Sequence, residues 1–240
     1  MPSQVRRATT LFVEGGSEDI LIDCGPGSLQ ALEDAGRSYR DIHRILITHF
    51  HPDHTLGLGR LFSAVKNDTA VTERHWIVIY GPLGLEKFIY GWNELYFNVV
   101  TDDDILNLVA METGYEIDIG DMMITDGPAD HGGRPALAYR IDMAGRSIVY
   151  TGDTSRSDGL DRFASGADLL VSECSFPDES PAEGHMTPAT VGEMASAAGA
   201  GEVLLVHMYP FFGETDPAAE VRRRFRGKVT TGRDGLVIEV

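Results

Sequence analysis

The sequence predicts an α/β fold in which helices cover the outer faces of β-sheets. Two patterns carry this prediction: strand-like segments first come in pairs joined by short turns, and further along the chain they alternate with helical patterns. In addition, no low-complexity linker and no short-period repeat divides the 240 residues. Because a chain of this length with 42% hydrophobic residues can bury a large core, we expect one layered domain over residues 1–240.

The first half of the chain is expected to start with a hairpin whose strands flank the turn Gly15-Gly16-Ser17. The tight loop Cys24-Gly25-Pro26-Gly27 then leads into a helix that Gly36 ends. The polar residues 101–104 begin a segment without a clear pattern. In this half we expect strands at 11–13, 20–23, 42–48 and 76–80, and helices at 28–35, 56–65 and 85–97.

The second half adds further strands and then alternates strands with helices. The turn Ala144-Gly145 joins two of the strands as a hairpin. Thr187 and Asp216 are expected to cap helices, because each is a capping residue type followed by a proline that suits the first helical position. We expect strands at 116–125, 138–142, 147–151, 167–172, 202–207, 228–231 and 236–240, and helices at 188–198 and 217–225.

The charge balance argues against an extended nucleic-acid-binding surface. The chain has 20 basic and 37 acidic residues, a net charge of −17, and phosphate affinity comes mainly from Lys and Arg. A small anionic substrate stays compatible, because a bound metal supplies its own positive charge. Cys24 and Cys174 are the only cysteines, which indicates a reducing compartment without a disulfide framework. Since no signal-peptide stretch and no long apolar run occurs, we expect a cytoplasmic protein without membrane contact.

The densest group of chemically active side chains is His49-Phe50-His51-Pro52-Asp53-His54. Three imidazoles and a carboxylate within six positions do not suit a packed core, because polar side chains are costly to bury unsatisfied. Imidazole and carboxylate are the usual protein ligands of zinc and related metals. The cluster follows the expected strand 42–48, so the sequence predicts a metal site in the loop at the carboxyl end of a strand.

Three further candidate ligands occupy the same kind of place. His131 lies in a polar loop after a strand, Asp153 directly follows another strand, and His207 ends a third. In layered α/β proteins the ends of strands converge on one edge, where ligand sites form. A lone histidine at a strand end is usually structural, but this repeated placement beside a dense cluster favours ligands that gather around one or two metals.

The whole pattern resembles the ligand set of the metallo-β-lactamase superfamily, and the segment 21–27 (LIDCGPG) is similar to the Asp-containing turn of that family. The resemblance implies a four-layer αβ/βα sandwich, with two mixed sheets, helices outside and a dinuclear metal site. It also implies that Asp23 orients the ligand loop through hydrogen bonds without touching metal. The implied ligands are His49, His51 and His131 for the first metal, Asp53, His54 and His207 for the second, and Asp153 as a bridge.

Two further segments, 172–176 (SECSF) and 184–188 (GHMTP), resemble motifs of the ribonuclease Z-like branch of this family. The resemblance implies that His185 lies beside the metals and stabilises phosphoryl oxygens or protonates the leaving group. Glu173 would orient His185, fix its tautomer and raise its pKa. The alternative is that His185 only precedes a helix capped by Thr187.

The chain departs from the branch in two respects, and the first bears on substrate size. Members that process transfer RNA usually carry a protruding arm, commonly between the positions matched here by His131 and Asp153, where this chain has room only for a hairpin. We therefore expect a member without the transfer-RNA-binding arm. Family members normally begin with an extra strand before the position of Arg7, so a missing edge strand or a shortened start is also expected.

These observations predict a metal-dependent hydrolase in which a hydroxide held by two metals attacks the substrate, with Asp53 also able to hydrogen-bond that hydroxide. The leading hypothesis is a phosphodiesterase acting on a small or exposed phosphodiester, such as a nucleotide derivative or an RNA 3′ end. Alternatives are a carbonyl hydrolase of the same fold, cleaving a lactone, thioester or β-lactam, and a non-catalytic metal-binding protein. The ligands suit two divalent ions, with zinc favoured and manganese or iron open. The family resemblance suggests a homodimer.

Overall fold

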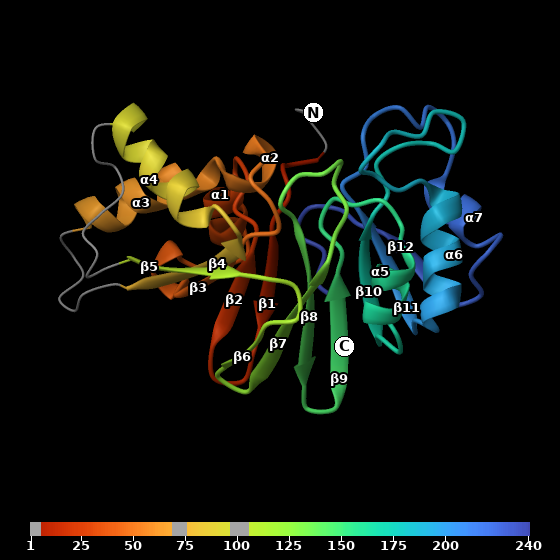
Figure 1. The fold of residues 1–240 in the computed structure, drawn as a ribbon, viewed down its shortest axis with the longest axis horizontal. Coiled ribbons are helices and arrows are strands. Elements are labelled where there is room, and N and C mark those ends of the chain that lie inside the picture. Colours follow the sequence, from red (N-terminus) through yellow and green to blue (C-terminus); the bar gives the residue numbers. More distant parts are fainter. Residues whose placement is uncertain (1–5, 69–75, 97–105) are drawn as a thin grey trace. The chain divides into compact units, whose positions relative to one another are not determined.

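The computed structural model describes residues 6–68, 76–96 and 106–240. The chain forms two compact units, an N-terminal unit over Pro2–Glu112 and a C-terminal unit over Thr113–Val240. Each unit contains one β-sheet and its own helices, as Figure 1 shows. Within the described residues, no helix combines the length and the apolarity that crossing a bilayer requires.

The N-terminal unit has a five-stranded mixed sheet with the order β1-β2-β3-β4-β5. The first two strands form an antiparallel hairpin, and β2 to β5 run parallel. A buried cluster that includes Ile45, Leu61, Ile79 and Trp92 joins this sheet to its helices. The strands are β1 (Leu11–Glu14), β2 (Asp19–Ile22), β3 (Arg44–Leu46), β4 (Ile77–Pro82) and β5 (Leu106–Met111). The helices are α1 (Ser28–Asp34), the single turn η1 (Tyr39–Asp41), α2 (Pro52–Thr55), α3 (Gly57–Asn67) and α4 (Leu85–Tyr96).

The C-terminal unit has a seven-stranded mixed sheet with the order β12-β11-β10-β9-β8-β7-β6. The strands β6 to β9 form an antiparallel meander, and β9 to β12 run parallel. Small and apolar side chains of α6, among them Val191, Met194 and Ala195, belong to a buried cluster with Val149, Leu170 and the other sheet residues. The strands are β6 (Glu116–Ile119), β7 (Met122–Pro128), β8 (Leu137–Met143), β9 (Arg146–Tyr150), β10 (Leu169–Glu173), β11 (Glu202–Val206) and β12 (Lys228–Thr231). The helices are α5 (Asp158–Phe163), α6 (Pro188–Ala198) and α7 (Pro217–Val221).

The prediction of two mixed sheets that carry helices is confirmed. The helix 188–198 and the strand 228–231 have the predicted bounds. The predicted strand 116–125 is wrong, because Gly120 (φ 60°) turns the chain there and separates β6 from β7. The predicted strand 236–240 is also wrong, since a turn closed by the bond from Leu236 N to Arg233 O precedes it and those residues join neither sheet.

One predicted helix is shorter in the structure, and several elements lie where none was predicted. The helix predicted over 217–225 ends at Val221, and the arginines that follow continue only as turns. The strand β5 and the short helices α2 and α5 were not predicted. Residues 101–104 lie outside the described residues.

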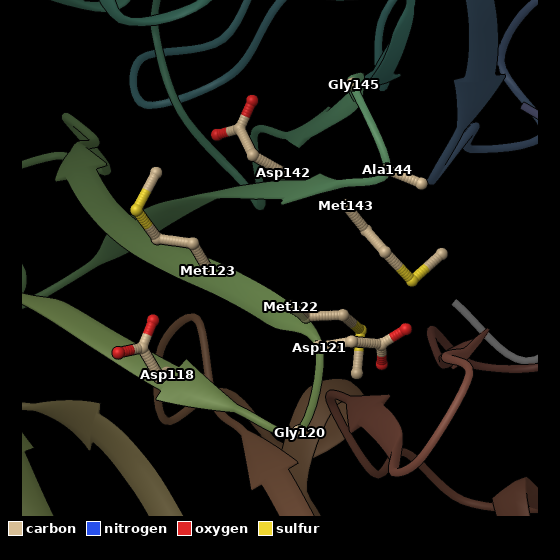
Figure 2. A pocket seen from close by; sticks show the side chains of 9 residues that line it. All are labelled: Asp118, Gly120, Asp121, Met122, Met123, Asp142, Met143, Ala144 and Gly145. Atoms are coloured by element: carbon tan, nitrogen blue, oxygen red, sulfur yellow. The ribbon is translucent and has the colours of Figure 1, made fainter.

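Two cavities lie within single units. One of about 310 Å³ lies in the C-terminal unit between the tips of the hairpins β6–β7 and β8–β9, where Asp118, Asp121 and Asp142 line it together with three methionines (Figure 2). The other, of about 670 Å³, lies in the N-terminal unit at the amino ends of β2, β3 and β4 and includes His43 and Trp76. None of the residues that line these cavities belongs to the predicted ligand set.

Candidate metal centre

The N-terminal unit positions the first cluster at the carboxyl end of β3. His49 and His51 lie in the loop after this strand, with ring centroids 4.7 Å apart in an edge-to-face arrangement. The prediction that the whole cluster is a loop is wrong in its second half, because Pro52 takes the first position of α2, where proline is favoured. Asp53 and His54 therefore lie on a helical turn, with His54 Nε2 3.9 Å from a carboxylate oxygen of Asp53.

Asp23 fixes the position of this cluster through hydrogen bonds, as the family resemblance implied. One of its carboxylate oxygens accepts hydrogen bonds from Thr48 N at 2.8 Å and from Thr48 Oγ1 at 3.0 Å. The other lies 2.7 Å from His54 Nδ1. Since a carboxylate can only accept, His54 donates through Nδ1 and presents Nε2 away from Asp23. Asp23 and His54 are both completely buried.

Glycines allow the turn after Asp23 to touch the ligand helix directly. A side chain at Gly25 would overlap the carbonyl oxygen of Asp53 at 2.1 Å, and one at Gly57 would meet the carbonyl oxygen of Gly25 at 2.4 Å. Cys24 N also donates to the carbonyl oxygen of His54 at 2.7 Å. The backbone of 23–25 thus fixes the backbone of α2 without an intervening side chain.

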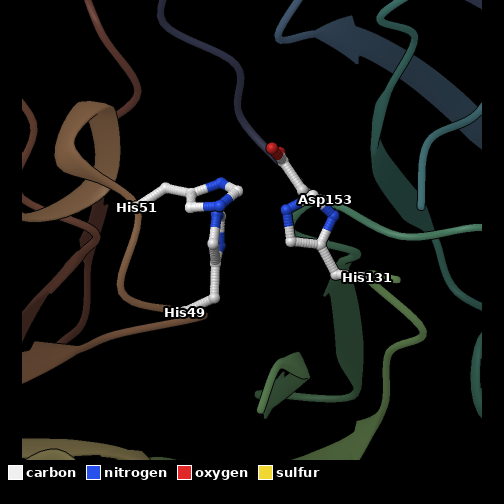
Figure 3. Close-up of side chains that lie close together, drawn as sticks. All are labelled: His49, His51, His131 and Asp153. Carbon is white, nitrogen blue, oxygen red and sulfur yellow. The ribbon is translucent and has the colours of Figure 1, made fainter. Parts of the chain in front are cut away.

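The C-terminal unit brings together the other predicted ligands. His131 follows β7, Asp153 follows β9, and His207 follows β11. His207 Nε2 lies 3.4 Å from a carboxylate oxygen of Asp153, and His185 offers a ligand atom within 4.8 Å of both. Figure 3 draws His131 and Asp153 of this unit and, from the N-terminal unit, His49 and His51.

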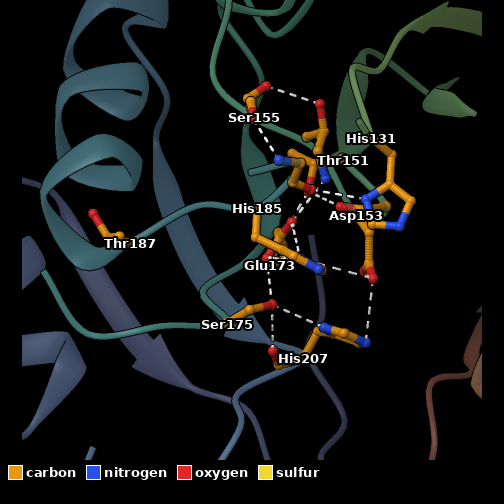
Figure 4. Close-up of polar contacts among 12 residues, drawn as sticks. His131, Thr151, Asp153, Ser155, Glu173, Ser175, His185, Thr187 and His207 are labelled. Carbon is orange, nitrogen blue, oxygen red and sulfur yellow. Dashed lines mark hydrogen bonds and ion pairs between the residues drawn. The ribbon is translucent and has the colours of Figure 1, made fainter. Parts of the chain in front are cut away.

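A buried carboxylate, Glu173 at the end of β10, organises these side chains (Figure 4). One of its oxygens accepts a hydrogen bond from Thr154 N at 2.7 Å, in the loop that carries Asp153. Its other oxygen accepts the hydroxyl proton of Ser175, whose Oγ lies 2.9 Å from His207 Nδ1. Because the single proton of Ser175 goes to the carboxylate, His207 donates through Nδ1 and presents Nε2 toward Asp153.

Glu173 also contacts His185, whose Nδ1 lies 3.1 and 3.2 Å from the two carboxylate oxygens. Burial raises the pKa of the Glu173 carboxyl above its ordinary value, the hydrogen bond from His185 opposes that rise, and the charge of Asp153 adds to it. The ring of His185 packs edge to face on that of His131 at 4.9 Å and lies parallel to that of His207 at 6.0 Å. His185 thus lies among the predicted ligands, although it also precedes the helix that starts after Thr187.

The donor chemistry of these residues fits divalent metal ions. Four of the predicted histidine ligands have Nδ1 against an oxygen: His49 on Thr48 at 3.1 Å, His54 on Asp23, His207 on Ser175, and His131 on the carbonyl oxygen of Gly184 at 2.8 Å. A histidine fixed in this way offers Nε2 as a lone-pair donor, which is the arrangement that zinc-binding histidines use. Sequence reasoning missed Ser175, Thr48 and Gly184, because hydroxyls and a backbone carbonyl have no sequence pattern that marks this role.

Two of these positions have a backbone conformation that is rare outside glycine. Asp23 has a φ of 57° and His207 a φ of 50°. Each residue directly follows a parallel strand, β2 and β11, and turns its side chain into the polar cluster of its own unit. Such positions cost of order 1–3 kcal/mol and persist where the surroundings hold them, typically at functional sites.

The two cysteines do not contribute a nucleophile. Both are free and buried. Burial raises the pKa of Cys24 to about 12 and also raises the pKa of Cys174. Both thiols therefore stay protonated at neutral pH.

These features coincide with a known family. A family model described as the beta-lactamase superfamily domain matches residues 18–208, and the chain belongs to this family. YhfI of Bacillus subtilis, named a probable metallo-hydrolase, is 30% identical over 245 aligned positions that cover 99% of this chain and 95% of that protein. Ribonuclease Z of Bradyrhizobium diazoefficiens is 26% identical over 294 positions that cover 99% of this chain and 96% of its own.

Solved structures give the same result. The crystal structure of YhfI, described as a metallo-β-lactamase fold protein, matches with a TM-score of 0.87 and 27% identity, covering 100% of this chain and 94% of that one. The short form of human tRNase Z matches with a TM-score of 0.76 and 25% identity, covering 100% and 95%. The predicted metallo-β-lactamase fold and the resemblance to ribonuclease Z are therefore confirmed. The chain is a hydrolase of this fold, and its family and donor groups imply that it binds divalent metal.

Proposed function

We propose that this protein is a phosphodiesterase with two divalent metal ions that acts on small or exposed phosphodiesters, such as a nucleotide derivative or an RNA 3′ end. The contact between His185 and Glu173, beside Asp153 and His207, is the observation that carries the proposal. A cationic donor placed there suits phosphoryl transfer, whose transition state carries negative charge on its oxygens. Relatives named ribonuclease Z and tRNase Z support a phosphodiester substrate.

We propose the ligand roles that the family pattern implies, with Asp153 as the bridge between both ions. The family match over residues 18–208, which contains every one of these positions, supports this assignment and a single domain over residues 1–240. Zinc is favoured because five of the seven ligands are histidines and the other two are aspartates, while manganese and iron remain alternatives. His49, His51 and His131 would hold the first ion, and Asp53, His54 and His207 would hold the second.

When bound, the metals would lower the pKa of a coordinated water and neutralise phosphoryl oxygens. The protein groups position the substrate and move protons. With Nδ1 facing the carboxylate of Glu173, His185 holds its second proton on Nε2. From there it donates to a phosphoryl oxygen or to the leaving group. Asp53, one-third exposed, is the ligand that also hydrogen-bonds the attacking water.

A small substrate is favoured over a whole transfer RNA. Between His131 and Asp153 the chain builds only the hairpin of β8 and β9, joined by the turn Ala144-Gly145. The net charge of −17 opposes an extended phosphate-binding surface. A cytoplasmic location and a homodimer remain predictions of the sequence.

The test is turnover of bis(p-nitrophenyl) phosphate by protein loaded with zinc or manganese, with metal content measured on the same samples. We expect turnover with about two ions per chain, and a loss of about 10²- to 10⁴-fold in kcat for His185→Ala. His43→Ala is the matched control and should keep full activity, because His43 lies outside the ligand set, with its ring 5.0 Å from that of Trp76.

Each rival has its own outcome in this experiment. Hydrolysis of a lactone, thioester or β-lactam without phosphodiester turnover, and without a specific effect of His185→Ala, would identify a carbonyl hydrolase. Metal binding without turnover of any of these substrates would identify a non-catalytic metal-binding protein. Either result contradicts the phosphodiesterase.

A further inference from the structure

Three aromatic side chains from two loops of the C-terminal unit form a continuous surface, called here the aromatic ledge: Phe176, Tyr209 and Phe211. The rings of Phe176 and Phe211 are stacked, with centroids 5.7 Å apart and planes 16° from parallel. Tyr209 lies 5.2 Å from Phe176 and 5.9 Å from Phe211. Phe211 is 51% exposed, so one side of this aromatic surface is open to a ligand.

The aromatic ledge begins directly at the polar cluster. The ring of Phe176 lies 5.3 Å from that of His185, and the ring of Tyr209 lies 5.3 Å from that of His207. The chain order gives the same continuity, since Phe176 follows Ser175, and Tyr209 lies two positions after His207. A ligand whose phosphoryl group lies at His185 can therefore reach the aromatic ledge directly, because Phe176 contacts the His185 ring.

Backbone hydrogen bonds connect the loops that carry the rings. Tyr209 N donates to the carbonyl oxygen of Ser175 at 3.2 Å, and Phe176 N donates to the carbonyl oxygen of Met186 at 3.4 Å. The three rings and His185 are thus held by segments that bond to one another, which is the preorganisation that a binding surface needs.

We propose that the aromatic ledge binds a nucleobase of the substrate by stacking, with Phe211 as the exposed face that the base covers. This deepens the proposed function, on which it rests, because it assigns the substrate class as a nucleotide or a nucleotide-ended phosphodiester. Stacking suits this protein, because it holds a nucleotide without basic side chains, and the net charge of −17 disfavours a strongly basic surface. Base–aromatic stacking also tolerates any base, since every base has a π face.

The test compares AMP with ribose 5-phosphate, which share sugar and phosphate and differ in the base. Both are titrated by calorimetry into the zinc-loaded full chain. We expect AMP to bind about tenfold more tightly than ribose 5-phosphate. Phe211→Ala should remove most of this difference while leaving the affinity for ribose 5-phosphate unchanged, and Phe211→Tyr should retain it. Tyr96→Ala, which changes a 55% exposed tyrosine of the N-terminal unit, is the matched control and should bind both compounds like the wild type.

Three results would overturn the proposal: equal affinity of the wild type for both compounds, no binding of either, or an equal loss for both in Phe211→Ala, which would indicate a disturbed loop. Turnover of bis(p-nitrophenyl) phosphate by the same samples distinguishes failure of this proposal from failure of the proposed function. Turnover without a preference for AMP contradicts only the proposal that the aromatic ledge binds a nucleobase. A preference for AMP without turnover contradicts the proposed phosphodiesterase function and supports the aromatic ledge as a nucleotide-binding surface.

Discussion

At the residue scale, one buried carboxylate connects several of the predicted site residues of the C-terminal unit. Glu173 contacts His185 directly and His207 through Ser175, and it accepts from the backbone beside Asp153. It thereby sets which nitrogen of His207 carries the proton, so that Nε2 of His207 stays a lone-pair donor, and it holds Nδ1 of His185 toward the carboxylate. The sequence predicted that Glu173 orients His185, and the structure extends this orienting role to His207 through Ser175.

Glu173→Gln tests this arrangement. Glutamine has one acceptor oxygen and one amide donor, so it cannot satisfy Ser175, Thr154 and His185 together. We expect a loss of about 10- to 100-fold in metal affinity or in kcat. Zinc content and bis(p-nitrophenyl) phosphate kinetics measure these two quantities on the same preparation.

Glu193→Gln is the control for that substitution. Glu193 pairs with Arg156 and Arg224 at the surface, with a side chain 47% exposed, so its loss should leave both quantities unchanged. Full metal content and full activity in Glu173→Gln would contradict the role of this carboxylate.

At the element scale, the ends of parallel strands determine where the ligands lie. His49, Asp153 and His207 follow strands of the two parallel sheet regions, and the sequence predicted each of these exits from an apolar run ended by a polar residue. The dense cluster was predictable because no packed core explains three histidines within six positions. The end of a strand is a local feature of the chain, so a sequence pattern predicts it well.

Other elements depend on contacts that the sequence does not display. The strand β5 and the helix α5 are short and lack a clear period, so only their neighbours define them. The hydrogen bonds of Ser175 to Glu173 and of Thr48 to Asp23 join residues that any loop could contain. The tight contact of Gly25 with the backbone of Asp53 likewise becomes visible only in three dimensions.

The close approach of Gly25 to the carbonyl oxygen of Asp53 can be tested by substitution. Gly25→Ala places a methyl group where the carbonyl oxygen of Asp53 lies, so the turn and α2 must separate. We expect a loss of about 1–3 kcal/mol in the free energy of unfolding, together with weaker zinc binding, because Asp53 and His54 move with α2. Urea denaturation and zinc titration measure the two effects.

Gly91→Ala is the matched control. Gly91 lies within α4, and among the described residues outside its own helix a side chain there meets no atom within 4 Å. Alanine should raise the free energy of unfolding by about 0.5–1 kcal/mol and leave zinc binding unchanged. Equal behaviour of the two variants would refute the idea that the turn after Asp23 positions the ligand helix.

At the scale of the whole molecule, charge and metal chemistry have opposite effects on an anionic substrate. The net charge of −17 repels phosphodiesters at long range, whereas bound cations attract them at short range. A nuclease that grips its substrate through many Lys and Arg residues instead loses affinity steeply as salt rises. The two arrangements therefore predict opposite responses to ionic strength.

Raising NaCl from about 50 to about 300 mM shortens the screening length from more than 10 Å to less than 8 Å, which weakens the long-range repulsion more than the contact at the metals. For bis(p-nitrophenyl) phosphate, with a single negative charge, kcat/KM should stay constant or rise by up to about twofold. For a short oligonucleotide with several phosphates the rise should be larger, because the repulsion grows with the charge of the substrate. Initial rates at matched metal loading check both expectations. A decline of kcat/KM that steepens with the number of phosphates would instead indicate an extended cationic binding surface, which the charge of −17 argues against.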